Sequence, residues 1–560
     1  MSSLERLAEL DAVRRLRQRD VTLFSDDVDQ RIPIMQRLGW TDLADKAPGR
    51  LPLLTGLAET LVAEDATDLL LLGMGGSSLA PLVMSRVIGE APGFPRLHVL
   101  DTTSPVHVTA LLESLDRERT YVVVASKSGT TIEPLALYAI VQDWLMAEGL
   151  TRAEAGRRCI VITDPGSPLE KLRQRDLMRM TLTAPVTVGG RYSALSMFGL
   201  APGALIGIHL PGVIQRAAAM EQACDAPLGH NPAALLASWM ADSWQAGKDK
   251  LTFVASERYR PLGLWIEQLV AESLGKDGRG IVPVIENRRP ERARYGTDRA
   301  IVVTRFHDDE PLAAWSRRMA ETHPVFELVV TDVFDLGAEF VRWEHAVALT
   351  GVLLGVNPFD EPSVAEAKTA TNTILEGGQA TVPPATLDLD GTWVTYAGGL
   401  APKLSPRNRV EALGASLAST REGDYIALLV YAPDDDERLA PLRAACDTVA
   451  DATGRAVCLE LGPRYLHSTG QLHKGGADNG VFLIVTARDR VDVAVPGKRY
   501  TLGMLHRAQA EGDLVTLDRH GRRVARFDLP TSDADALAAF AEDLAAAARL
   551  RTGGAGPTFR

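Results

Sequence analysis

The sequence has little cysteine, no long apolar run and no excess of positive charge. Its four cysteines lie far apart without Cys-x-x-Cys spacing, which favours buried thiols over disulfides or a metal site: Cys159, Cys224, Cys446 and Cys458. No apolar stretch approaches the ~20 residues of a membrane-spanning helix, and residues 1–6 begin a charged helix rather than a signal peptide. A net charge of -12 gives no electrostatic reason to bind nucleic acid. We therefore expect a cytoplasmic protein without membrane or nucleic-acid partners.

The length and the alternation of apolar runs with helical patterns predict several α/β domains. At roughly 150 residues per domain, 560 residues make three or four domains. Nearly continuous apolar strands that alternate with helices are typical of doubly wound parallel sheets. We expect a helical segment at 1–60, two such domains at 61–225 and 226–390, a third α/β region at 391–552 and a flexible tail at 553–560.

Eleven apolar runs are the predicted strands. In the first two domains they are Leu69–Leu72, Leu97–Leu100, Tyr121–Val124, Cys159–Thr163, Leu251–Val254, Ile281–Ile285, Ala300–Val303 and Phe326–Val330. In the third region they are Tyr425–Val430, Val457–Leu461 and Val481–Val485. The first sixty residues read as amphipathic helices that brace the domain that follows them.

Two of these strands end in glycine and hydroxyl residues, at Gly73–Ser78 and at Ser126–Thr131. In a parallel sheet both ends fall at the carboxyl edge, where backbone N–H groups and helix N-termini favour an anion. Six hydroxyls and one lysine suggest a mostly neutral site for one small phosphate. A dinucleotide fingerprint would need glycine at Ser78, and a P-loop would need a lysine that this turn lacks. For the first segment alone, a tight turn without a ligand is an equally good interpretation.

Five further polar residues are candidates for chemistry. Arg191 follows a glycine pair at a helix start, from which it can reach a bound oxyanion. Gln268 and Glu272 border the apolar stripe of a helix predicted at 262–275, where partial desolvation would raise the pKa of a glutamate toward that of a general base. Taken alone, Lys368 reads as a solvated helix lysine and His467 as a loop-capping residue.

Together these segments resemble the phosphoglucose isomerase family, which is built from two sugar-isomerase (SIS) domains. The matching stretches are Gly73–Pro81, Ser126–Glu133, Val188–Ser193, Gln268–Gly280, Gly355–Lys368 and Leu466–Gln471. The sequence is most similar to the isomerase half of bifunctional transaldolase/phosphoglucose isomerases, and no stretch resembles the transaldolase barrel.

The resemblance implies an interconversion of glucose 6-phosphate and fructose 6-phosphate through a cis-enediol(ate), with no metal and no cofactor. It assigns Glu272 as the base, Arg191 as the cation for the intermediate, and Lys368 and His467 as the residues that open the sugar ring. Gln268 would touch the sugar. The phosphate would be held by Gly76, Ser77, Ser126, Lys127, Ser128, Thr130 and Thr131.

One departure from the family concerns His467, which follows Lys368 here, whereas the family's histidine loop precedes the lysine helix. His307, His323 and His345 lie in the usual interval but carry no motif. We expect the appended third region to supply in cis a histidine that family dimers borrow from a partner subunit.

Two alternative functions remain open. A non-catalytic SIS module that senses sugar phosphates would have no use for Glu272, Lys368 and Arg191 together. The second alternative is a different SIS enzyme. A phosphoglucose/phosphomannose isomerase would differ in the shape of its pocket. An aminating synthase would need an ammonia-generating domain, which we do not find in the sequence. The expected partner is a small sugar phosphate. The oligomeric state stays open, and a separate transaldolase is one candidate protein partner.

Overall fold

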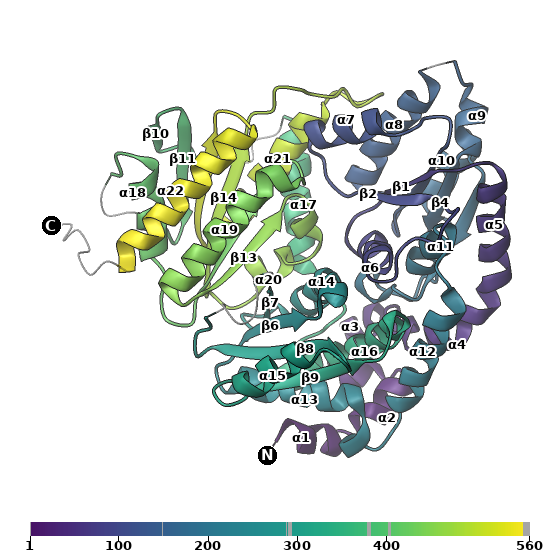
Figure 1. Ribbon diagram of the computed structural model, residues 1–560, viewed down its shortest axis with the longest axis horizontal. Helices are drawn as coiled ribbons and strands as arrows, with labels where there is room; N and C mark the ends of the chain where they lie inside the picture. Colours follow the sequence, from purple (N-terminus) through teal and green to yellow (C-terminus); the bar gives the residue numbers. More distant parts are fainter. Residues whose placement is uncertain are drawn as a thin grey trace.

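The computed structural model describes residues 2–147, 149–286, 288, 294–377, 382–400 and 405–552, in which three sheets form (Figure 1). The expected tail at 553–560 lies outside this part. The first sheet has the strand order β2-β1-β3-β4-β5, and all its pairs are parallel. Its strands are β1 (Asp68–Leu72), β2 (Arg96–Leu100), β3 (Thr120–Ala125), β4 (Cys159–Thr163) and β5 (Met180–Thr183). This is the flavodoxin-like order, whose switch point lies between β1 and β3.

The second sheet repeats this arrangement with four parallel strands in the order β7-β6-β8-β9. They are β6 (Lys250–Ala255), β7 (Val282–Ile285), β8 (Arg299–Phe306) and β9 (Val325–Val330). The strands β3 and β6, central in the first and second sheets, are buried along their whole lengths. Helices on both faces explain why these strands read as continuous apolar runs. The two expected doubly wound sheets are therefore confirmed.

The third region forms a mixed sheet in the order β10-β11-β15-β14-β12-β13. Its strands are β10 (Leu387–Leu389), β11 (Thr392–Gly398), β12 (Tyr425–Val430), β13 (Ala456–Leu461), β14 (Gly480–Ala487) and β15 (Arg523–Leu529). The β10–β11 hairpin joins the four parallel strands through an antiparallel β11–β15 pair. The strands β5, β10, β11 and β15 were not among the eleven predicted, because their polar residues interrupt the apolar runs.

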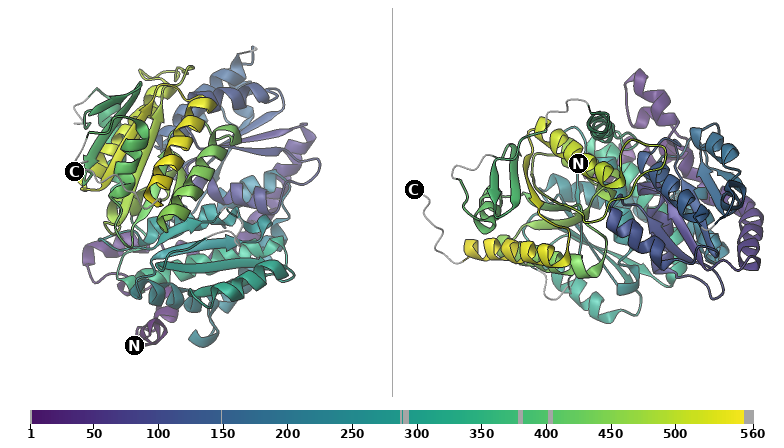
Figure 2. Two further views of the ribbon diagram at one scale, coloured as in Figure 1. Left: turned by 60° about the vertical axis from the view of Figure 1, so that its left-hand side comes forward. Right: turned by 90° about the horizontal axis from the view of Figure 1, so that it is seen from above.

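Side chains of β12 alternate between the two faces of the third sheet, as strand geometry requires. Ile426, Leu428 and Val430 join a core with α19 (Asp436–Thr453) and α22 (Ala534–Thr552). Tyr425 and Leu429 join a second core with α21 (Leu502–Arg519) and with β7 of the second sheet. The views in Figure 2 show α19 and α22 side by side on the outer face. The third region therefore packs on the rest of the chain through its α21 face.

The remaining helices form the N-terminal segment and cover the sheets. The N-terminal segment comprises α1 (Ser3–Glu9), α2 (Ala12–Arg17), α3 (Val28–Met35), α4 (Leu43–Lys46) and α5 (Leu51–Ala63). The next helices in the chain are α6 (Leu79–Val87), α7 (Pro105–Ser114), α8 (Ile132–Met146), α9 (Arg152–Arg157), α10 (Pro168–Arg175), α11 (Met197–Leu205) and α12 (Leu210–Ala223). The others are α13 (Pro232–Gln245), α14 (Leu262–Leu274), α15 (Glu310–Met319), α16 (Leu336–Leu354), α17 (Pro362–Leu375), α18 (Arg409–Ala418) and α20 (Gly470–Gly475).

One large hydrophobic core unites the N-terminal segment with the first two sheets. It contains Leu7 and Trp40 of the N-terminal segment, Leu71 of β1 and Leu269 of α14. The segment thus braces both sheets, while the domain boundaries stay a prediction. All four cysteines are free and buried. Within the described ranges, no helix is long and apolar enough to cross a membrane.

Candidate functional site

Two glycine-containing loops meet at the carboxyl edge of the first sheet. The short helix η4 (Gly75–Ser77) follows β1, and η5 (Gly190–Tyr192) follows β5. A Cβ atom on Gly76 would lie 2.0 Å from the carbonyl oxygen of Gly190, so only glycine allows this approach. Ser193 Oγ donates to the Gly76 carbonyl over 3.2 Å, which ties the loops together. Gly76 and the buried Ser77 thereby lie beside Arg191.

The loop Ser126–Thr131 follows β3 next to η4 and is organised by its own hydroxyls. Ser126 Oγ lies 3.0 Å from Thr131 Oγ1 and accepts from the backbone N–H of Gly129 at 3.1 Å. Ser128 and Thr130, the exposed pair of the loop, are joined by hydroxyls 2.9 Å apart. Lys127 Nζ donates to Asp164 Oδ2 at 2.5 Å. The lysine charge is therefore balanced by a carboxylate, and the loop presents mainly neutral donors.

Glu272 and Arg191 form a buried ion pair between α14 and η5. Arg191 Nη1 lies 3.1 Å from Glu272 Oε1 and 3.1 Å from Glu361 Oε2. Its other donors bond to Ser273 Oγ at 2.9 Å and to the carbonyl of Pro358 at 2.7 Å, which fixes the guanidinium. Burial raises the pKa of Glu272, and the Arg191 charge opposes this rise. Glu272 is only 8% exposed, so its carboxylate is largely shielded from bulk water.

Gln268 connects Glu272 to the third region. Gln268 lies one helical turn before Glu272 on α14. Its side-chain Nε2 donates to Glu272 Oε2 at 3.1 Å and to the backbone carbonyl of His467 at 2.8 Å. A Cβ atom on Gly75 would lie 2.7 Å from the same nitrogen. Gln268 therefore links the backbone of His467 to the Glu272 carboxylate within one chain, although His467 follows Lys368 in the sequence.

The partner of His467 is Glu133, which sequence reasoning did not assign. His467 Nε2 lies 2.8 Å from Glu133 Oε1, and Gln509 Nε2 donates to the same oxygen at 2.7 Å. Burial pushes the pKa of Glu133 upward, but the charge and hydrogen bond of His467, a backbone hydrogen bond and the charge of Lys368 together outweigh it, so this pKa lies below its ordinary value. Glu133 lies in the first turn of α8, where an acidic residue also suits the helix dipole. Its position in the sequence therefore did not indicate a role at the site.

Lys368 lies on α17 with an exposed side chain, close enough for its charge to act on Glu133. Several other histidines lie elsewhere. His473 is buried 3.4 Å from Glu460, His323 lies near Gly296, and His345 lines a separate cavity. The structure thus brings together Glu272, Arg191, Gln268 and His467, with the glycine loops beside them and Lys368 at the rim.

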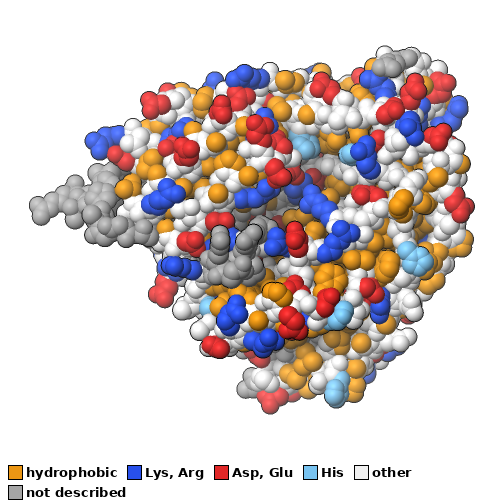
Figure 3. Space-filling model, viewed as in Figure 1, with side chains coloured by type: hydrophobic (Ala, Val, Ile, Leu, Met, Phe, Trp, Pro, Cys, Tyr) orange, Lys and Arg blue, Asp and Glu red, His pale blue; other side chains and the backbone are white. Residues whose placement is uncertain are grey.

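A groove and a cavity are two of the hollows that described residues line outside this cluster. The groove, of about 820 Å³, lies between the third region and α6 and α14, and its lining includes Arg86, Arg260, Arg288, Arg443 and Arg464. Basic side chains gather near the middle of the face seen in the space-filling view (Figure 3). Arg464 begins η10 (Arg464–His467) and binds Asp101 at 2.7 and 2.8 Å, which anchors the histidine turn to the edge of the first sheet.

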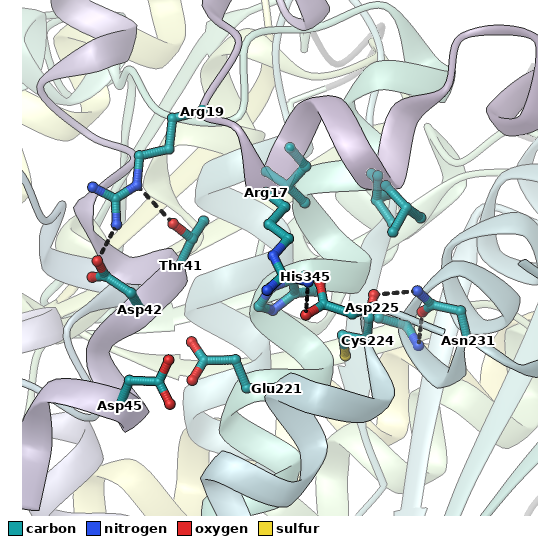
Figure 4. Close-up of a pocket in the computed structure, with 14 residues that line it drawn as sticks. Arg17, Arg19, Thr41, Asp42, Asp45, Glu221, Cys224, Asp225, Asn231 and His345 are labelled. Carbon is teal, nitrogen blue, oxygen red and sulfur yellow. Dashed lines mark hydrogen bonds and ion pairs between the residues drawn. The ribbon is translucent and has the colours of Figure 1, made fainter. Parts of the chain in front are cut away.

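The second hollow is a cavity of about 350 Å³ between α2, α12 and α16 (Figure 4). The carboxylates of Asp45 and Glu221 point toward one another there. Arg17 pairs with Asp225, and Arg19 pairs with Asp42 at 2.5 Å. Burial and the neighbouring acids raise the pKa of Glu221 to about 8. None of the predicted site residues lines this cavity.

Comparison with solved structures shows the class of this fold. A hypothetical protein from Thermus thermophilus superposes with a TM-score of 0.57 at 27% identity and covers 66% of this chain and 96% of its own. A glucose-6-phosphate isomerase from Chlamydia trachomatis has a TM-score of 0.52 at 22% identity over 59% of this chain and 73% of its own. The two doubly wound sheets therefore have the fold of the α/β sugar-isomerase (SIS) proteins.

Comparison with known sequences narrows this class to a family. The phosphoglucose isomerase family model matches residues 54–282. A probable glucose-6-phosphate isomerase of Haloarcula marismortui is 32% identical over 370 residues, which are 58% of this chain and 81% of that protein. A glucose-6-phosphate isomerase of Rubrobacter xylanophilus is 32% identical over 237 residues, 40% of this chain and 54% of that protein. The chain belongs to the phosphoglucose isomerase family.

Proposed function

We propose that this chain is a glucose-6-phosphate isomerase, which converts glucose 6-phosphate and fructose 6-phosphate into one another. The observation that carries the proposal is the buried Glu272 carboxylate, which shares Arg191 with Glu361 and lies one hydrogen bond from the Gln268 amide that holds the His467 turn. A sensing module has no need to bury a carboxylate against a fixed guanidinium. The same proposal includes a role in glycolysis and gluconeogenesis and a cytoplasmic location.

In this mechanism His467 and Glu133 open the sugar ring by moving a proton between the ring oxygen and the C1 hydroxyl, with Lys368 at the rim. The loop Ser126–Thr131 and Ser77 hold the phosphate through hydroxyls and backbone N–H groups. Orientation by the remote phosphate places C2 of the opened chain against Glu272.

Glu272 then takes the C2 proton while the electrons of the C–H bond move into the C1–C2 bond and onto O1. Arg191 stabilises the resulting enediolate, as oriented donors do where charge develops. The proton of the C2 hydroxyl moves to O1, C2 becomes the carbonyl carbon, and Glu272 delivers its proton to C1. Burial raises the pKa of Glu272 and makes its carboxylate a stronger base than an exposed one.

Hydrogen exchange at C2 tests the proposal. The protein is incubated with fructose 6-phosphate in heavy water, and deuterium at C2 of glucose 6-phosphate is followed by NMR. We expect rapid incorporation with the wild type and a fall of about 10³-fold or more with Glu272→Gln, because the base is lost.

The matched control is Glu221→Gln, a carboxylate outside the candidate site that we expect to leave exchange unchanged. Inorganic phosphate should still bind Glu272→Gln, which shows an intact site. Wild-type protein without exchange would refute the isomerase, and undiminished exchange in Glu272→Gln would exclude this residue as the base.

A further inference from the structure

The N-terminal segment reaches the candidate site next to Arg191. Leu38 forms an antiparallel bridge with Val188, and the backbone N–H of Gly39 donates to the Thr187 carbonyl at 2.8 Å. The Trp40 ring stacks on Tyr192 with centroids 5.0 Å apart. These contacts fix the segment that follows α3 against the loop that carries Arg191.

Arg37 is the charged residue that this attachment brings to the site. Its side chain passes Gly189, because a Cβ atom on that glycine would lie 3.4 Å from Arg37 Cδ. Its charge acts on groups from two sides: on Lys127 and Asp164 beside the hydroxyl loop, and on Glu361 beside Arg191. Arg37 therefore lies between the hydroxyl loop and the Arg191 cluster.

The charges around it show what Arg37 can contribute. Lys127 is balanced by Asp164 at 2.5 Å, and Arg191 is shared by Glu272 and Glu361 at 3.1 Å each. The loop Ser126–Thr131 otherwise offers hydroxyls and N–H groups. A sugar phosphate brings up to two negative charges into this neutral setting. A guanidinium is the side chain best suited to bind phosphate oxygens in a planar, two-pronged geometry.

We propose that Arg37 is a further substrate-binding residue, whose guanidinium binds the phosphate group held by the loop Ser126–Thr131. This inference rests on the proposed function, because it assigns the Arg37 guanidinium to the phosphate charge of the same substrate. It also makes the N-terminal segment a part of the site rather than a brace alone.

Arg37→Gln tests this role, with Arg31→Gln as its matched control. Arg31 is an exposed arginine of α3, six residues earlier. We expect Arg37→Gln to raise KM for fructose 6-phosphate and the inhibition constant of inorganic phosphate by about 10-fold to 100-fold, because a charge-assisted hydrogen bond is lost. The kcat should change less than about 3-fold, since ground state and transition state carry the same phosphate. Arg31→Gln should change neither constant.

Arg37→Lys separates binding from a structural role. A lysine keeps the charge, so we expect it to recover part of the phosphate affinity, whereas a purely structural arginine would alter thermal stability without altering phosphate inhibition. Unchanged inhibition by phosphate in Arg37→Gln would overturn the proposal. Failure of the proposed function is distinguishable, because it would appear as wild-type protein without exchange at C2, whatever Arg37 does.

Discussion

Glu272 in the candidate site and Glu221 in the cavity of Figure 4 are both carboxylates whose pKa is raised by burial, but their neighbours differ. Glu272 lies 3.1 Å from Arg191 and accepts a hydrogen bond from Gln268. Around Glu221 the arginines pair with other acids, Arg17 with Asp225 and Arg19 with Asp42. Within the described part of the chain, Glu221 Oε2 has no hydrogen-bond partner.

The comparison teaches that a raised pKa does not by itself identify a base. What distinguishes Glu272 is the fixed guanidinium of Arg191 beside it, which in the proposed mechanism also stabilises the developing oxyanion. The charge of Glu221 acts instead on another carboxyl, that of Glu344, which is 2% exposed and whose pKa burial and Glu221 raise together. The arginines of the cavity, Arg17 and Arg19, are engaged by other acids.

Removal of Arg191 should have the largest effect, because this cation is what distinguishes the surroundings of Glu272 from those of Glu221. Arg191→Gln leaves Glu272 and Glu361 buried without their cation. We expect kcat to fall about 10²- to 10³-fold and the free energy of unfolding to fall by about 3 kcal/mol. Steady-state kinetics and urea denaturation measure the two effects. Arg191→Lys keeps the charge and should lose less stability; equal losses in both variants would mean that charge is not what matters.

Glu133→Gln should have the next largest effect, confined to ring opening. The amide can still accept from Gln509 but cannot balance a protonated His467, so we expect kcat to fall about 10- to 100-fold. Supplying an acyclic aldose phosphate, which needs no ring opening, should bring the variant close to the wild type. A deficit of the same size with the acyclic substrate would assign Glu133 to the proton transfer at C2 instead. Glu154→Gln, at an exposed helix start, is the control.

The strands of the first two sheets other than β5 were predictable because their sequences are nearly continuously apolar. β4 and β12 begin and end where the sequence indicates, whereas β11 and β15 carry polar residues such as Thr395 and Asp528 that are buried within the sheet. Strands of that kind are recognised only once their neighbours are known. The domain boundaries and the residue roles at the site stay predictions.

Candidate site residues in a local pattern could be proposed from the sequence, and those that act through distant contacts could not. Gly76 and Ser126 lie in short loop patterns, and Glu272 borders the apolar stripe of a helix. Glu133 meets His467 from 334 positions away, and the segment with Arg37 reaches the Arg191 loop through backbone pairing. No spacing in the sequence encodes such contacts, because they depend on how three sheets pack.

Glu221→Gln should change stability in a pH-dependent way. The pKa of Glu221 is about 8 in the folded protein against an ordinary 4.5, so between these values the folded state holds a proton that the unfolded chain has released. Wild-type stability therefore falls as pH rises through this window. We expect the variant to gain about 1 to 2 kcal/mol over the wild type at pH 8, a figure reduced for partial exposure, and little at pH 5. A difference that is constant with pH would contradict the raised pKa.

Arg17→Gln should have the smallest effect and completes the contrast with Arg191. The Arg17 side chain is 69% exposed, and its partner Asp225 is 32% exposed, so water screens the pair. We expect urea denaturation to show a loss below about 0.5 kcal/mol and kinetics to show none. A loss above about 1 kcal/mol would mean that the arginines of the cavity hold α2 on α12 as firmly as Arg191 holds its two glutamates. The difference between the two regions would then lie in access to substrate rather than in the strength of their ion pairs.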